Sequence, residues 1–242
     1  MTLQLSHTIA ALVLGGLSAW ISCVLWRWMP QNILNQEAQW LAHMQSRTWT
    51  PDASHSWRAC ALQTLTDWRQ SLLWVLTGIG LAGLLLGTRG ASLSTFLWGV
   101  WLWTLLTAAA IDVRSQLLPD NLTQPLLWLG LIIQTSQSLT TVGLENALWG
   151  AVTGYLILWF MDQLYMRWRG ISGVGQGDMK LLAAIGAWLG AQPVPHVLLL
   201  AALAALMGQA AMRLRKGQNI TTAEFAFGPW IALAAVGYWF WL

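Results

Sequence analysis

Apolar stretches long enough to cross a membrane restrict the possible folds of this chain more than any other feature. Hydrophobic residues make up 56% of the 242 residues and charged residues only 9%, whereas soluble domains carry roughly 25% charged residues. The chain also contains 19 tryptophans, whose amphipathic rings favour the headgroup level of a bilayer. These features predict an all-α, polytopic membrane protein.

We expect about eight transmembrane helices, since each needs roughly 17–25 mainly apolar residues. Their approximate ranges are 8–29, 71–88, 92–111, 122–138, 143–165, 179–192, 194–212 and 224–242. We expect no cleavable signal sequence, because no Lys or Arg precedes Arg27. The predicted organisation is a first transmembrane helix (residues 1–30), a short cytoplasmic segment (31–70) and a membrane-embedded domain (71–242).

The distribution of basic residues predicts the orientation of these helices. If the N-terminus lies outside, 11 of the 12 Lys and Arg residues fall on the inner side and Arg89 alone falls on the outer side. Basic residues are enriched in cytoplasmic loops of membrane proteins. We therefore expect both termini on the periplasmic side.

A glycine-rich stretch, GVGQGD, comes directly before the sixth expected span. Gly173, Gly175 and Gly177 alternate before Asp178, and such residues allow unusual backbone angles and close approach of another chain. A phosphate-binding loop is not expected here, because no strand precedes the stretch and no GK[ST] follows it. Two complete spans separate Asp112 from Asp178, so both carboxylates are expected at the cytoplasmic side.

Three of the acidic residues have simpler interpretations that the sequence leaves open. Asp112 could pair with the arginine two residues later, and Asp120, in the turn LPDN, could cap the fourth span. Asp162 lies near the end of the fifth span. An ionisable residue there is a functional candidate, but an ion pair with Arg167 or Arg169 is the simpler expectation.

Three stretches together resemble one family. They are IDVRSQLLPDNLTQPLLWLGLI, YMRWRGISGVGQGDMKLLAAIGAWLGA and FAFGPWIALAA, in that order. They resemble the motifs of the type IV prepilin peptidases, which are membrane aspartyl proteases of the GxGD type. The resemblance implies that Asp112 and Asp178 are the catalytic pair. It also implies site-supporting or substrate-binding roles for Gly175, Gly177, Lys180, Asp120, Gly228 and Pro229.

The resemblance further implies a bacterial inner-membrane enzyme that cleaves the N-terminal segment of a prepilin or pseudopilin. Its partners would be that segment and the lipid bilayer, without nucleic acid, and hydrolysis would need no metal or organic cofactor. The chain departs from many members in one respect: residues 31–70 contain Cys60 as their only thiol and no CxxC motif. A zinc site of four thiolates is impossible there, which leaves the family's N-methyltransferase activity in question.

Other functions remain as alternatives at this point. One is a bifunctional peptidase and N-methyltransferase, and another is a presenilin-type protease that cuts helices already anchored in the membrane. A third, from a different class, is an ion-coupled transporter in which Asp112, Asp162 and Asp178 line an ion path. The end-of-span positions of Asp112 and Asp178 favour the protease.

The expected helix ends predict different roles for the two aspartates. Asp178 lies at a helix N-terminus, where the helix dipole stabilises an anion, and Lys180 adds positive charge nearby. Asp112 lies at a helix C-terminus, where the dipole favours the neutral acid. We therefore predict that Asp178 is the ionised partner and that Asp112 carries the shared proton.

Overall fold

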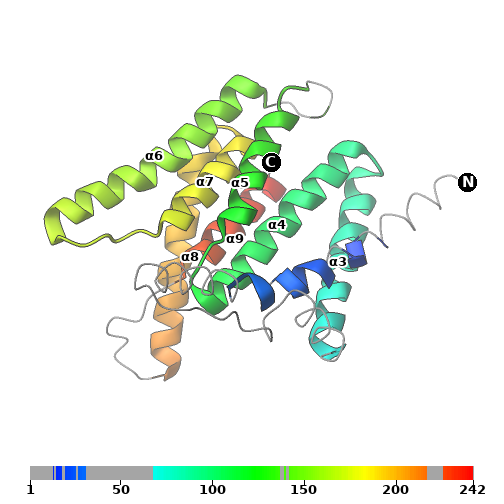
Figure 1. Cartoon of the computed structure of the whole chain (residues 1–242), viewed down its shortest axis with the longest axis horizontal. Coiled ribbons are helices and arrows are strands. Elements are labelled where there is room, and N and C mark those ends of the chain that lie inside the picture. Colours follow the sequence, from blue (N-terminus) through cyan, green and yellow to red (C-terminus); the bar gives the residue numbers. More distant parts are fainter. Residues whose placement is uncertain are drawn as a thin grey trace, which may run out of the picture. The chain divides into compact units, whose positions relative to one another are not determined.

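The computed structural model describes residues 13, 15–17, 20–25, 27–30, 68–136, 139, 142–216 and 226–241. Most of the expected cytoplasmic segment, with Cys60, lies outside the described residues. All regular structure in the described ranges is α-helical, so the predicted all-α class is confirmed for them. The helices are α3 (Trp68–Arg89), α4 (Leu93–Ser115), α5 (Asp120–Ile133), α6 (Leu144–Arg169), α7 (Gln176–Leu189), α8 (Pro193–Lys216) and α9 (Gly228–Trp241), as labelled in Figure 1. The described residues between 13 and 30 are helical as well.

Two described helices are long and apolar enough to cross a membrane. They are α4 and the Pro193–Met212 part of α8. Each expected span from residue 71 onward overlaps one helix, but α5, α7 and α9 have only 14 residues each. At a rise of about 1.5 Å per residue such a helix is roughly 21 Å long, short of a hydrocarbon core of about 30 Å. The number of eight crossings therefore stays a prediction.

The chain folds as two compact units, residues 1–103 and 104–242, and the boundary falls within α4. In the first unit a stretch of helix packs closely on α3, since a Cβ atom at Gly15 would lie 2.9 Å from the Cβ of Ala82. The indole of Trp103 donates a hydrogen bond to Ser22 Oγ over 2.5 Å. Cys23 is fully buried in this unit, where it packs as a small hydrophobic residue.

Helix α7 is the centre of the second unit. It contacts α5, α6, α8 and α9, and every residue from Leu181 to Leu189 is buried. It crosses α6 with the two backbones in contact: a Cβ atom at Gly150 would overlap the carbonyl oxygen of Gly186, and a Cβ at Gly186 would overlap that of Gly150. Small residues four apart, Gly150 and Gly154, allow this approach, as in other membrane helix pairs.

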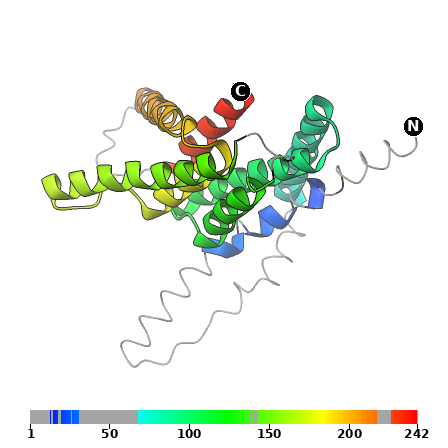
Figure 2. The ribbon, with the colours of Figure 1, turned by 90° about the horizontal axis from the view of Figure 1, so that it is seen from above.

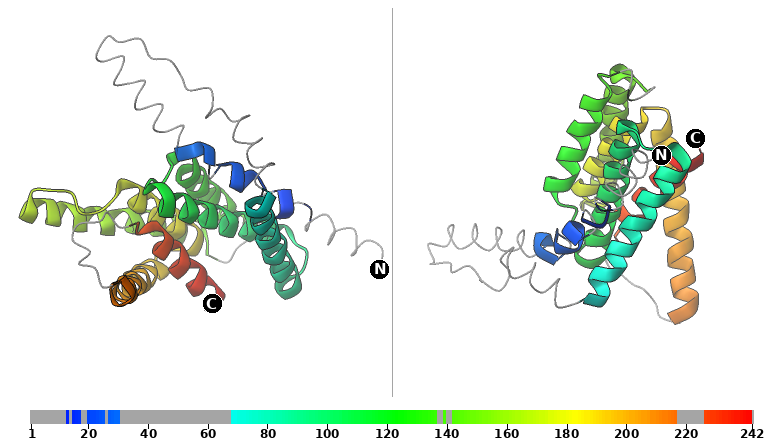
Figure 3. Two further views of the ribbon diagram at one scale, coloured as in Figure 1. Left: turned by 90° about the horizontal axis from the view of Figure 1, so that it is seen from below. Right: turned by 90° about the vertical axis from the view of Figure 1, so that its right-hand side faces the viewer.

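Buried polar bonds fix α5 against α7. The indole N–H of Trp188 donates to the Leu126 carbonyl over 2.9 Å, and the Gln134 amide donates to the Trp188 carbonyl over 3.0 Å. Unsatisfied polar groups are costly in an apolar interior, so these bonds specify the register of the two helices. On another side of the unit, α8 and α9 pack together (Figure 3). The Trp230 ring lies against Gly208 at this contact.

Helix α6 is the longest of the described helices, and its last turns project beyond α5 and α7 (Figures 1 and 2). It ends at Gly170, which has a left-handed conformation (φ 76°) and donates its N–H to the Met166 carbonyl over 2.8 Å. A glycine in this conformation is a common helix terminator. Residues 170–175 then return along α6, and this path brings the start of α7 back toward the body of the unit (Figure 1).

Candidate active site

Asp112 is a buried carboxylate in the last turn of α4. Its side chain is 4% exposed, and Oδ2 accepts a hydrogen bond of 3.0 Å from the backbone N–H of Gly228. Gly228 is the first residue of α9, so the carboxylate faces the N-terminus of that helix. Pro229 follows at the second position of α9, where its missing N–H costs no intrahelical bond.

Asp178 lies in the first turn of α7 and is half-buried. Its backbone N–H donates to the carbonyl of Gly175 over 3.1 Å, and Gly175 is the extended residue from which the helix begins. A Cβ atom at Gly175 would lie only 3.2 Å from Asp178 Oδ2. The absence of a side chain at Gly175 therefore leaves the approach to this carboxylate open.

Leu118 connects the surroundings of the two carboxylates. A Cβ atom at Gly177 would lie 2.6 Å from Leu118 Cβ, and a Cβ at Gly228 would lie 3.0 Å from Leu118 Cδ1. Burial, and after it the negative charge of Asp112, raise the pKa of Asp178 to about 7. Gly177, which precedes Asp178, and Gly228, which binds Asp112, thus pack on the same leucine. Leu118 was not singled out from the sequence, although it lies in the first quoted motif.

Lys180 and Asp120 form an ion pair. The Lys180 Nζ lies 2.7 Å from both carboxylate oxygens of Asp120. Asp120 is the first residue of α5 and makes no side-chain capping bond, since Pro119 holds the cap position, so the expectation of an N-cap is wrong. The pair joins the starts of α5 and α7. Lys180 therefore reaches Asp120 instead of only adding positive charge next to Asp178.

Asp162 has partners other than the expected arginines. Its Oδ1 accepts hydrogen bonds from Ser172 Oγ (2.8 Å) and from the backbone N–H groups of Gly173 (2.8 Å) and Val174 (3.1 Å). The carboxylate is buried inside this ring of donors. The expectation of an ion pair with Arg167 or Arg169 is wrong. The carboxylate is instead bound by donors of the segment that returns after α6.

The structure also changes the grounds for assigning roles to the two aspartates. The sequence argument placed Asp112 only at the C-terminus of its own helix, but the N–H and the positive dipole end of α9 face it across the unit. No hydrogen bond to the Asp178 carboxylate occurs among the described residues. The helix dipoles and Lys180 therefore do not favour ionisation of Asp178 over Asp112 in the way that the sequence predicts.

Such an arrangement can activate water. Two carboxylates close together share one proton, so that one removes a proton from water while the other protonates a carbonyl oxygen. In the described part of the chain, no group of three or more His, Cys, Asp or Glu residues is placed to hold a metal ion.

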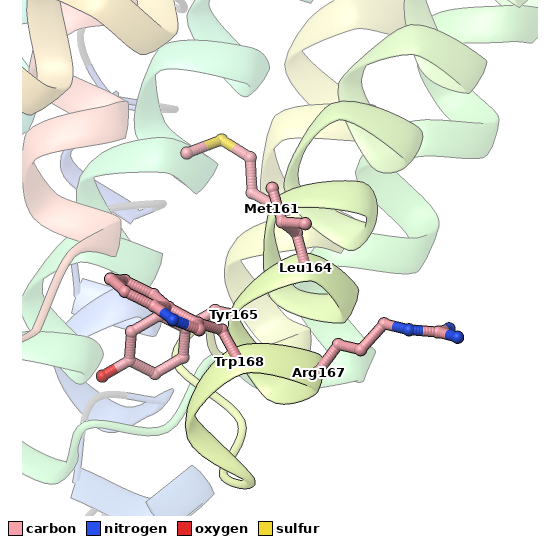
Figure 4. A pocket seen from close by; sticks show the side chains of 5 residues that line it. All are labelled: Met161, Leu164, Tyr165, Arg167 and Trp168. Carbon is pink, nitrogen blue, oxygen red and sulfur yellow. The ribbon is translucent and has the colours of Figure 1, made fainter.

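A separate hollow of about 570 Å³ lies at the projecting end of α6 (Figure 4). Five residues of this helix line it: Met161, Leu164, Tyr165, Arg167 and Trp168. Tyr165 and Trp168 lie on the same side of the last turns, and Arg167 points away from them (Figure 4). Neither Asp112 nor Asp178 lines this hollow.

Comparison with known proteins gives a consistent result. Residues 99–208 match the model of the type IV leader peptidase family. The chain is similar to the prepilin leader peptidase/N-methyltransferase of Stutzerimonas stutzeri (47% identity, over 54% of this chain and 45% of that protein). The proteins of the same name from Dickeya chrysanthemi (43%, over 69% and 58%) and Escherichia coli strain K12 (44%, over 57% and 60%) are also similar.

The match thus covers about half of the length of these curated relatives. No solved structure is significantly similar to the chain. The matched residues include Asp112, Asp178 and the return segment after α6. Residues 99–208 are therefore similar in sequence to the type IV leader peptidase family.

Proposed function

We propose that this protein is a membrane aspartyl endopeptidase that removes the short leader of type IV prepilins or pseudopilins. Asp112 and Asp178 are the catalytic pair in this proposal. The observation that carries it is the position of Asp112 at the end of α4 and of Asp178 at the start of α7, where Gly228 beside Asp112 and Gly177 next to Asp178 both pack on Leu118. The names of the relatives support the same reaction.

The reaction proceeds by general acid–base catalysis. The ionised aspartate takes a proton from water as the water oxygen attacks the scissile carbonyl, and the protonated aspartate gives its proton to the carbonyl oxygen. Breakdown of the tetrahedral intermediate expels the amine, which receives a proton from the dyad. The N–H of Gly228 and the N-terminus of α9 stabilise a carboxylate at Asp112, so we assign the resting negative charge to Asp112 and the proton to Asp178. The pair still titrates as a unit.

The proposal places the protein in the bacterial inner membrane, with eight crossings and both termini in the periplasm. The bias of basic residues toward one side supports this orientation. Large apolar side chains on α6, such as Phe160 (64% exposed) and Leu164 (62%), suit contact with lipid. Reporter fusions after Gln116 and after Gly143 test the orientation, since the first is expected in the cytoplasm and the second in the periplasm.

The substrate is the N-terminal segment of a prepilin, with a basic leader in the cytoplasm and an apolar helix in the bilayer. Cleavage falls at the boundary between them, at the depth of Asp112 and Asp178. Gly175 is exposed beside Asp178, so an extended substrate backbone can approach the dyad there. No metal or organic cofactor and no nucleic acid takes part.

Co-expression with a full-length prepilin, followed by mass spectrometry of the product, tests this function. A product shortened by the leader alone, cut at the edge of the apolar helix, is the expected result. Cleavage within the apolar helix would favour a presenilin-type protease, and an uncut prepilin beside a correctly inserted enzyme would contradict the proposal. An additional methyl group on the new N-terminus would show that the chain also methylates without a CxxC motif.

A further inference from the structure

The acid at position 162 is the one buried carboxylate of the described chain that the dyad does not use. Asp162 lies two turns before the end of α6. One of its carboxylate oxygens, Oδ1, accepts all three hydrogen bonds from the returning segment. Two of these donors, Gly173 and Val174, are backbone N–H groups. The carboxylate therefore determines the path of the main chain and not merely the position of a side chain.

A second contact holds the same segment. A Cβ atom at Gly173 would lie 2.6 Å from Cδ1 of Tyr165, so the tyrosine ring packs directly on the glycine backbone. Tyr165 comes one turn after Asp162 on the same face of α6, because residues three apart are neighbours on a helix. Figure 4 shows Tyr165 beside the last turns of α6. The carboxylate and the ring together attach residues 172–174 to the helix.

The attached segment leads directly to Asp178. Val174 is followed by Gly175, whose carbonyl accepts the N–H groups of Asp178 (3.1 Å) and Met179 (3.4 Å) in the first turn of α7. Gly175 also lies against the Asp178 carboxylate. A shift of Val174 would therefore move the turn that orients Asp178.

We propose that Asp162 is a positioning residue, whose hydrogen bonds to residues 172–174 set the start of α7 and thereby the distance of Asp178 from Asp112. This inference rests on the proposed peptidase function. It assigns to Asp162 neither substrate contact nor proton transfer. The carboxylate acts as an acceptor for three donors, a role that an amide oxygen can partly replace.

The test uses the full-length protein in detergent, with purified prepilin as substrate and Asp162→Ala, Asp162→Asn and Glu145→Ala as variants. Glu145 is an exposed acid in the first turn of the same helix and serves as the matched control. We expect Asp162→Ala to lower kcat about 10- to 100-fold with little change in KM, since displacement of a reacting group by about 1 Å has effects of this size. Asp162→Asn should regain a large part of the lost kcat, and Glu145→Ala should behave as wild type.

Hydrogen–deuterium exchange gives a readout that does not depend on activity. The Gly173 and Val174 amides should exchange roughly tenfold faster or more in Asp162→Ala. The reason is that loss of a hydrogen bond to a charged group changes the opening equilibrium by at least about tenfold. Unchanged exchange, or a wild-type kcat in Asp162→Ala, would overturn the proposal. An Asn variant as inactive as the Ala variant would also overturn it, since the negative charge would then be what matters. A change in KM alone would overturn it because Asp162 would then act in substrate binding. If wild type fails to cut prepilin, the proposed function fails while the exchange result still decides the role of Asp162.

Discussion

Gly228 donates its backbone N–H to Oδ2 of Asp112 over 3.0 Å, and the two residues lie 116 positions apart in the chain. The contact is possible because Gly228 has no side chain: a Cβ atom there would lie 2.7 Å from that oxygen and 3.0 Å from Leu118 Cδ1. The FGP stretch thus brings a helix N-terminus to the carboxylate at the end of α4.

The first prediction concerns this contact. Gly228→Ala should lower the rate of prepilin cleavage by about 100-fold, because the added methyl group must displace Asp112 or α9 by a distance to which catalysis is sensitive. Gly237→Ala is the control, since Gly237 lies in the same helix and a Cβ atom there meets nothing within 4 Å. Initial rates at equal amounts of inserted protein check the prediction, and equal rates for the two variants would refute it.

The second prediction concerns the ion pair of Lys180 and Asp120. The side chains are 28% and 55% exposed, so solvent screens the pair and its coupling energy should be about 0.2–1 kcal/mol. A double-mutant cycle with Lys180→Ala and Asp120→Ala, followed by unfolding in detergent, measures this energy. A coupling of several kcal/mol would show that the pair is far better shielded than its exposure indicates.

The third prediction concerns the crossing of α6 and α7. Gly186→Ala should lower the free energy of unfolding by about 2 kcal/mol, since overpacking a tight contact costs roughly 1–3 kcal/mol and a backbone carbonyl cannot rotate away. Gly80→Ala in α3 meets nothing within 4 Å and should leave stability unchanged or raise it by up to about 1 kcal/mol. Thermal unfolding followed by tryptophan fluorescence compares the two. A Gly186→Ala protein as stable as wild type would contradict the described crossing.

The helices of this fold were predictable from sequence because the length of an apolar stretch and the polar residues that end it are local signals. Every expected span from residue 71 onward overlaps a helix, and GVGQGD does open α7 at Gln176. The crossing of α6 and α7 could have been predicted too. Gly150 and Gly154 stand four residues apart, as do Gly186 and Gly190, and this spacing is typical of closely packed membrane helices.

The details of the site depend on contacts that local signals do not specify. Lys180 lies two residues from Asp178 in the chain but pairs with Asp120, 60 positions away, because α5 and α7 begin side by side. Asp162 binds donors that reach it only because the chain reverses at Gly170. The sequence shows which charged residues are neighbours along one helix. The hydrogen bonds of the fold depend on how separate helices pack against one another.

We propose that Asp112 and Asp178 act as one catalytic pair. Replacing either carboxylate by an amide removes the shared proton, so each single variant should lose as much activity as the double variant. The most direct measurement is cleavage of purified prepilin by full-length Asp112→Asn, Asp178→Asn and the double variant in detergent, beside Glu145→Gln. We expect no detectable cleavage by the first three and wild-type cleavage by Glu145→Gln. Cleavage near the wild-type rate by either folded single variant would contradict it.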